Sequence, residues 1–252
     1  MTFEVAAEAY ERFMGRYSSQ LAPQLAGLAQ VRAGQRILDV GCGPGALTAE
    51  LVGRVGDEAV CAVDPSESFV AAASARLPGV DVRRGSAELL PFADAVFDAA
   101  LAQLVVHFMT DPVAGLREMK RVTAPGGIVA ACVWDHAGRR APLSVFWQAA
   151  RDLHPEVQDE SDLAGVREGH LGELFVKADL ASVDETSFQA SVRFASVEEW
   201  WEPFTLGVGP AGAYAQSLDQ QSRDRLLARC TQLLPAPPFT LNAWAWAARG
   251  VA

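Results

Sequence analysis

The sequence predicts an α/β protein built on a doubly wound parallel sheet. Between residues 37 and 134, short apolar segments alternate with segments whose apolar residues have helical spacing. Several of the apolar segments lack polar alternation, which is typical of strands that helices cover on both faces. The glycine-rich stretch GCGPG at 41–45 directly follows the first of these segments. Doubly wound sheets bind their ligands at the carboxyl ends of the strands, where this loop would lie.

Length, charge and cysteine content narrow the class of protein. The 252 residues, 50% of them hydrophobic, can bury one large core, so we expect 1–252 to be a single domain. The net charge of -10 disfavours nucleic-acid binding, which depends on clustered Lys and Arg. The N-terminal segment does not resemble a signal peptide, and no run of 18 apolar residues is present, so we expect a cytoplasmic protein without a membrane span. Four scattered cysteines and four distant histidines predict neither disulfides nor a metal site.

The elements of the first half follow from local signals. Residues 6–17 place apolar side chains on one helical face, and Pro23 is expected to begin a second short helix that ends near residue 30. Ser66 and Asp111 are expected to cap the helices that follow them, and Pro112 suits a first helical position. The expected strands lie within 36–40, 59–64, 80–85, 96–106 and 127–134, and the expected helices within 46–55, 66–77 and 111–123.

The second half, 135–252, has a different pattern that predicts substrate-side helices and two late strands. Helices are expected at 142–153, 168–180 and 219–234, and strands at 182–194 and 239–250. Ser196 and Glu199 form a capping box that predicts a further helix start. The Gly-, Pro- and Ala-rich residues 207–213 are expected to form a loop. The late strands therefore flank a helical insert, at one edge of the sheet.

The glycine-rich loop fits two kinds of ligand. Gly41, Gly43 and Ala46 satisfy the loose dinucleotide pattern, and Asp64 ends the next strand, where an acid can bind a ribose diol. NAD and adenosyl cofactors both contain such a diol. Glycine lets the ligand approach the backbone closely, and the helix that follows presents free N–H groups. The loop alone therefore leaves both ligands open.

Five successive segments decide between these ligands by resemblance. ILDVGCGPG (37–45) resembles motif I of the class I S-adenosylmethionine (SAM)-dependent methyltransferases, and VCAVDPS (60–66) and GSAELLPF (85–92) resemble the two motifs that follow. FDAALAQLVVHFMTDP (97–112) and MKRVTAPGGIVA (119–130) resemble the family's fourth strand and the next helix–turn–strand unit. The resemblance, to the UbiE-like small-molecule branch, covers most of residues 5–134. It implies a Rossmann-like seven-stranded sheet of order 3-2-1-4-5-7-6 with an antiparallel last strand, and an N-terminal helical lid.

The resemblance also implies a cofactor, SAM, with S-adenosylhomocysteine as product, and a site in the core at 31–134. Arg16 is expected to pair with the methionyl carboxylate, and Asp64 to hold the ribose. Ser86 stands where the family commonly has Asp, which weakens the adenine contact there. The predicted cofactor-binding residues are Tyr10, Arg16, Asp39, Gly41, Gly43, Asp64, Pro65, Ser86, Ala87, Glu88 and Gln103.

The sequence shows no firm catalytic base. His107 follows the fourth strand and is the first candidate, although a buried structural histidine fits the position better. His136 and His154 lie in expected loops and are weaker candidates. The sulfonium is already a good leaving group, so methyl transfer can proceed by alignment alone. The expected acceptor is a small, rather apolar metabolite, and Trp134 is the aromatic residue expected in its pocket. Two alternative functions stay open, an NAD(P)-dependent oxidoreductase and a non-catalytic SAM-binding protein. The oligomeric state also stays open, with a homodimer as one possibility.

Overall fold

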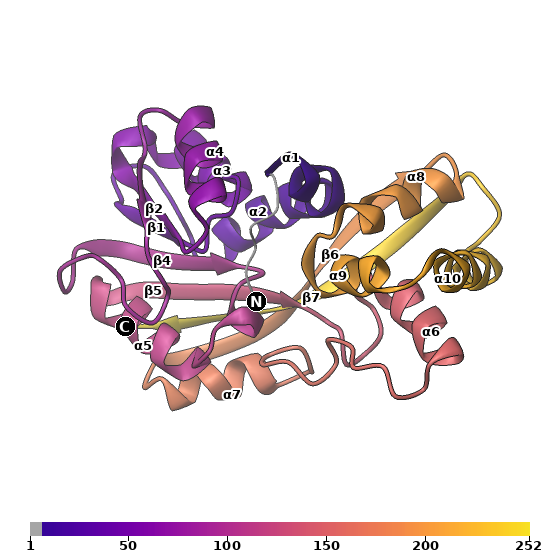
Figure 1. Ribbon diagram of the computed structural model, residues 1–252. Coiled ribbons are helices and arrows are strands. Elements are labelled where there is room, and N and C mark those ends of the chain that lie inside the picture. The colour runs from indigo at the N-terminus through magenta and orange to yellow at the C-terminus, as the bar shows by residue number, and fades with distance from the viewer. Residues whose placement is uncertain (1–6) are drawn as a thin grey trace.

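The computed structural model describes residues 7–252, whose strands form one seven-stranded sheet (Figure 1). The strand order β3-β2-β1-β4-β5-β7-β6 confirms the prediction, and β7 is antiparallel to both of its neighbours. The strands are β1 (Ile37–Val40), β2 (Val60–Asp64), β3 (Asp81–Arg84), β4 (Phe97–Gln103), β5 (Thr123–Trp134), β6 (Ala181–Phe194) and β7 (Phe239–Val251).

Helices cover both faces of this sheet. Ile37 faces a core shared with α2, α3 and the helical insert, whereas Leu38 and Val40 face a second core shared with α5 and α7. β1 and β2 are buried along their whole length, as their largely apolar sequences predict. The helices are α1 (Ala7–Tyr10), α2 (Arg16–Leu28), α3 (Ala46–Val55), α4 (Glu67–Arg76), α5 (Pro112–Val122), α6 (Ser144–Leu153), α7 (His170–Lys177), α8 (Val197–Trp201), α9 (Gly209–Ser217) and α10 (Gln220–Leu233).

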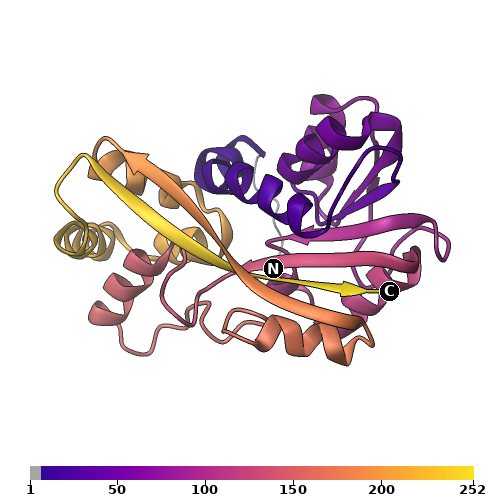
Figure 2. The ribbon, with the colours of Figure 1, turned by 180° about the vertical axis from the view of Figure 1, so that it is seen from behind.

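The antiparallel strand pair β6–β7 extends beyond the rest of the sheet (Figure 2). β7 pairs with β5 only from Ala245 onward, but with β6 from Phe239. Its far end carries α8, α9 and α10, which confirms the helical insert before the last strand. Aromatic rings join this insert to α6, because Phe146 stacks on Phe204 with centroids 4.6 Å apart. The insert is therefore packed onto the main body.

Two expectations about helices are wrong. Pro23 does not begin a helix but lies inside α2, which follows a π-helical turn over Glu11–Gly15. Its ring removes one hydrogen bond, to the carbonyl of Ser19, and Ser19 is exposed, so water can satisfy that group. Residues 207–213 are mostly helix rather than loop, since α9 begins at Gly209 with a proline in its first turn, where proline is tolerated.

The predicted caps are present. Ser66 Oγ accepts a hydrogen bond from the Phe69 amide, and Asp111 Oδ1 accepts one from the Ala114 amide. The four cysteines are buried and unpaired. Within residues 7–252, none of the helices is long and apolar enough to cross a membrane. Residues 1–6 of the predicted lid lie outside the described residues, and the cytoplasmic location and the homodimer stay predictions.

Candidate functional site

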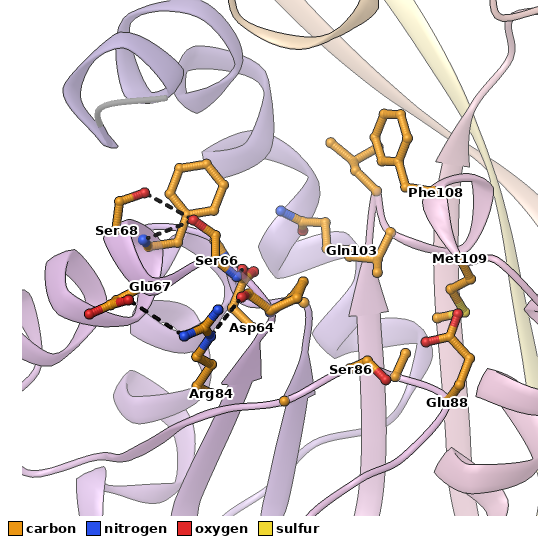
Figure 3. Close-up of a pocket in the computed structure, with 18 of the residues that line it drawn as sticks. Asp64, Ser66, Glu67, Ser68, Arg84, Ser86, Glu88, Gln103, Phe108 and Met109 are labelled. Carbon is orange, nitrogen blue, oxygen red and sulfur yellow. Dashed lines mark hydrogen bonds and ion pairs between the residues drawn. The ribbon is translucent and has the colours of Figure 1, made fainter. Parts of the chain in front are cut away.

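A cavity of about 740 Å³ lies at the carboxyl ends of β1, β2 and β4, where the strand order reverses. Figure 3 shows Asp64 and Ser66 on one side of it, Glu88 and Met109 on the other, and Gln103 between them. The cavity brings together nine of the eleven predicted cofactor-binding residues, all except Arg16 and Asp39. These nine are Tyr10, Gly41, Gly43, Asp64, Pro65, Ser86, Ala87, Glu88 and Gln103.

The glycine loop is fixed to the neighbouring strand. The amides of Gly41 and Cys42 both donate to the carbonyl oxygen of Val63, at 2.7 and 3.0 Å. Gly41 has φ +71°, and a Cβ built on it would lie 2.4 Å from Val105 Cγ2. This position therefore needs glycine for two reasons, the left-handed backbone and the close approach of the segment after β4.

Asp64 ends β2 with its carboxylate in the cavity wall. Oδ2 accepts a hydrogen bond from the Gly43 amide at 2.9 Å, and Oδ1 accepts one from the Ser66 amide at 2.8 Å. Burial raises the pKa of this carboxyl, and the two amide bonds oppose that effect. Each oxygen keeps a second lone pair. Asp64 can therefore hold the loop in place and still accept hydrogen bonds from a ligand's hydroxyl groups.

Asp39 lies behind the loop rather than in the cavity. The side chain is 1% exposed, and Oδ2 accepts a 2.6 Å hydrogen bond from the Thr48 hydroxyl on α3. Burial raises the pKa of Asp39 to about 7, while the Thr48 bond opposes the rise and the Asp64 charge adds to it. The contact joins the strand before the loop to the helix after it, which makes Asp39 a support of the loop.

The opposite wall comes from residues 85–88 and from the end of β4. Glu88 Oε1 accepts a hydrogen bond from the Thr110 amide at 2.8 Å, which fixes the segment between β4 and α5. Gln103 Nε2 donates to the Ser18 carbonyl on α2 at 3.1 Å. Gln103 Oε1 is buried and has no hydrogen-bond partner among the described residues. A buried acceptor of this kind in a cavity wall is suited to a donor group of a ligand.

Of the two lid residues predicted to bind cofactor, only Tyr10 lines the cavity. Arg16 instead donates to Glu199 at 2.9 Å and to the Arg193 carbonyl at 2.7 Å, and lies over the Phe194 ring. These partners are more than 170 positions away in the sequence, so no local pattern around Arg16 could reveal them.

The cavity has further lining residues that sequence reasoning missed. Phe69 extends the motif that contains Asp64, Phe108 and Met109 follow β4, and Arg84 ends β3 beside Glu67 at 3.5 Å. Their positions in the sequence are the available signal, because each lies at the carboxyl end of a strand or a few residues after it. Trp134 does not line the cavity; it is buried against Tyr17, with ring centroids 5.8 Å apart.

His107 also lies outside the residues that line the cavity. It belongs to a short turn after β4, and its side chain is 4% exposed. Burial lowers its pKa well below the usual value, with a smaller contribution from His136, so the ring is neutral. Within residues 7–252, no group of three His, Cys, Asp or Glu side chains is arranged to hold a metal ion.

Comparison with known proteins agrees with this arrangement. Residues 38–131, which include the glycine loop and the carboxyl ends of β1, β2 and β4, match the family model of a methyltransferase domain. Residues 38–131 are therefore similar to a methyltransferase domain. The chain is 35% identical over 146 residues to malonyl-[acyl-carrier protein] O-methyltransferase of Erwinia billingiae, and the match covers 58% of this chain and 57% of that protein. It is 41% identical over 96 residues to demethylmenaquinone methyltransferase of Beutenbergia cavernae, covering 38% and 39%.

The chain spans about half the length of the curated relatives it matches. A solved structure with the same fold is phosphoethanolamine N-methyltransferase 2 of Haemonchus contortus, in complex with phosphomonomethylethanolamine and S-adenosylhomocysteine. The TM-score is 0.58 at 18% identity, and the likeness covers 97% of this chain and 56% of that one. The two curated relatives and this structure act on different acceptors by name, so the comparisons leave the acceptor of this chain open.

Proposed function

We propose that the protein is a SAM-dependent methyltransferase that acts on a small, rather apolar metabolite. The main support for this proposal is the position of Asp64. Its carboxylate lies in the cavity wall at the end of β2 and accepts a hydrogen bond from the Gly43 amide of the glycine loop. There it can bind the two ribose hydroxyls of the cofactor. The backbone at Ala87, with Ser86 beside it, would hold the adenine, and the free Gln103 Oε1 would accept from the methionyl ammonium group.

The charges of the cavity favour this cofactor over a dinucleotide. Asp64, Glu67 and Glu88 line the cavity, and Arg84, the cation in its wall, lies 3.5 Å from Glu67. An anionic pyrophosphate would meet a net negative wall, whereas a ligand with a sulfonium and an ammonium group is attracted to it. When bound, SAM supplies a methyl group on a positively charged sulfur. The protein then mainly aligns donor and acceptor, which can contribute about 7–11 kcal/mol.

The chemistry of the remaining wall supports an apolar acceptor. Leu104, Val105, Phe108 and Met109 form an apolar part of the wall after β4. Apolar walls with few polar groups are typical of sites for small metabolites. The names of the two curated relatives specify a malonyl-acyl carrier protein and a demethylmenaquinone; the apolar wall is closer in character to the second of these acceptors.

Calorimetry with SAM, S-adenosylhomocysteine and NAD tests the cofactor. We expect the two adenosyl ligands to bind and NAD not to bind; the reverse would replace the proposal with an oxidoreductase. Asp64→Ala should weaken S-adenosylhomocysteine binding by about 1–3 kcal/mol, because a charged hydrogen-bond acceptor is lost. Glu58→Ala is the control, since Glu58 is exposed near the start of β2, away from the cavity. Methyl transfer to a member of an acceptor panel then separates an enzyme from a binding protein.

A further inference from the structure

A glycine on α5 leaves room for a side chain of the cavity wall. Gly115 is buried near the start of that helix and does not itself line the cavity. A Cβ built on it would lie 2.5 Å from Met109 Sδ and 3.3 Å from Met109 Cε, whereas packed carbon atoms keep about 3.5–4.0 Å apart. The missing side chain at position 115 therefore leaves a notch, and the thioether of Met109 occupies it.

Met109 belongs both to this notch and to the cofactor cavity. It lines the cavity, is half-buried, and packs against the core that contains Leu116. The Cβ of Ala87, another lining residue, is 3.5 Å from the same built Cβ position, so Ala87 borders the notch as well. Figure 3 shows Met109 beside Glu88, in the wall opposite Asp64. The notch therefore places the thioether in the wall next to Ala87.

The backbone around Met109 is anchored. The Met109 amide donates a hydrogen bond to the Val106 carbonyl at 3.3 Å, and the Thr110 amide donates one to Glu88 Oε1 at 2.8 Å. On the core side, Leu116 is fully buried, and close-packed interiors have little space to accept a displaced side chain. A change at the notch is therefore absorbed by rotation of the Met109 side chain, and the cavity is the direction open to it.

The proposed cofactor brings its adenine to this part of the wall. An adenine held by the backbone at Ala87, with Ser86 beside it, presents a hydrogen-bonding edge there, and that edge carries the 6-amino group. The thioether of Met109 would then lie at the edge of the ring, where contacts between sulfur and aromatic rings are favourable. Because a thioether is only a weak hydrogen-bond acceptor, this contact recognises the shape of the ligand rather than its polarity.

We propose that Met109, positioned by Gly115, makes the site selective for an adenosyl ligand whose 6-amino group is unsubstituted. The inference rests on the proposed function and concerns the cofactor end of the same cavity. A substituent on that nitrogen would extend into the space that the thioether fills, and the anchored backbone and the buried core leave no room for both. Met109 determines the specificity by contact with the ligand. Gly115 is a positioning residue, because it acts only through Met109.

The first test is calorimetry with S-adenosylhomocysteine and with its N⁶-benzyl derivative as the probe. We expect the wild-type protein to bind the derivative at least about tenfold more weakly, because a closely packed wall rejects an added group. Met109→Ala removes the thioether and should lower the ratio of the two dissociation constants at least about tenfold. Phe108→Ala is the matched control, since Phe108 lines the same wall but lies on the far side of Met109 from Glu88 (Figure 3). The control should leave the ratio within about twofold.

Three outcomes of this test would overturn the proposal. They are an unchanged ratio in Met109→Ala, an equal fall of the ratio in Phe108→Ala, and equally tight binding of both ligands to the wild-type protein. If the wild-type protein bound neither ligand, the proposed function itself would fail, and this inference with it. The two failures therefore give different results.

The second test concerns Gly115 and includes a rescue. Gly115→Ala should weaken S-adenosylhomocysteine binding about tenfold, because the added methyl group drives the thioether toward the ligand. Adding Met109→Ala should recover most of that loss, whereas general damage to α5 would not be recovered. Gly53→Ala is the control, since Gly53 lies in α3 and a Cβ added there would meet nothing within 4 Å. Unchanged affinity in Gly115→Ala, or a loss that Met109→Ala does not recover, would overturn the positioning role.

Discussion

The contact between Gly41 and Val105 offers a quantitative test of the loop geometry. Replacing Gly41 by alanine places a Cβ 2.4 Å from Val105 Cγ2 and 2.7 Å from Cγ1, at a residue with φ +71°. The left-handed backbone alone costs about 1–2 kcal/mol for a residue with a Cβ, and overpacking adds about 1–3 kcal/mol. We therefore expect Gly41→Ala to lower the free energy of unfolding by about 2–5 kcal/mol, measured by urea denaturation.

A double-mutant cycle separates the two contributions. Val105→Ala removes both clashing methyl groups, so it should recover about 1–3 kcal/mol in the Gly41→Ala background, as a coupling free energy. Gly34→Ala isolates the backbone contribution, because Gly34 has φ +86° and a Cβ added there would meet nothing within 4 Å; it should cost only about 1–2 kcal/mol. A coupling free energy within about 0.5 kcal/mol of zero would show that Val105 does not constrain the loop, and the close-approach explanation would fail.

Three further predictions concern residues around the cavity. Arg16→Ala should leave the affinity for S-adenosylhomocysteine within about twofold, as measured by calorimetry. It should lower the free energy of unfolding by at most about 1 kcal/mol, because the ion pair of Arg16 is exposed. A large loss of affinity would show that Arg16 does bind the cofactor. Thr48→Val should cost about 1–3 kcal/mol in urea denaturation, since it removes the hydroxyl hydrogen bond to the buried Asp39 carboxyl. A neutral effect would contradict the supporting role. Because the folded-state pKa of Asp39 is raised from 3.8 to about 7, the folded state holds the proton more tightly, and stability should fall as pH rises from about 4 to about 7. Asp39→Asn should remove that part of the pH dependence, and an unchanged pH profile would refute the assignment.

Much of the fold and of the cofactor wall could be predicted because their signals are local. The largely apolar strand sequences, the glycines of the loop and the acid that ends β2 each lie within a few residues of the feature they specify. The wrong expectation at 207–213 also has a physical reason. The glycines and proline around Gly209 predict a loop, but the alanines that follow favour a helix and bury Ala211 and Ala215 against the insert.

The contacts among His107, His136 and Glu160 could not be predicted for a different reason. Each residue taken singly fits a buried or loop position, and neither histidine lies near the other in the sequence. Only the packing of the turns after β4 and β5 against the segment before α7 brings them within reach of one another. Tertiary clusters of this kind carry no periodic or motif signal. The sequence therefore shows the individual residues but does not show that they contact one another.

The lid helix shows why Arg16 lies away from the cavity. Arg16, Gln20 and Gln24 are spaced by four residues on α2, a rise of about 6 Å per step, which nearly equals two residues of a strand. Their side chains bond the backbone of alternate residues on β6: Arg16 donates to the carbonyl of 193, Gln20 both donates to and accepts from 191, and Gln24 donates to the carbonyl of 189. These hydrogen bonds satisfy backbone N–H and C=O groups of the edge strand β6, which could otherwise pair with a strand of another chain. Moving Arg16 toward a cofactor would break its hydrogen bond to the Arg193 carbonyl, the first bond of this series. The contacts between α2 and β6 therefore explain the position of Arg16 without a ligand.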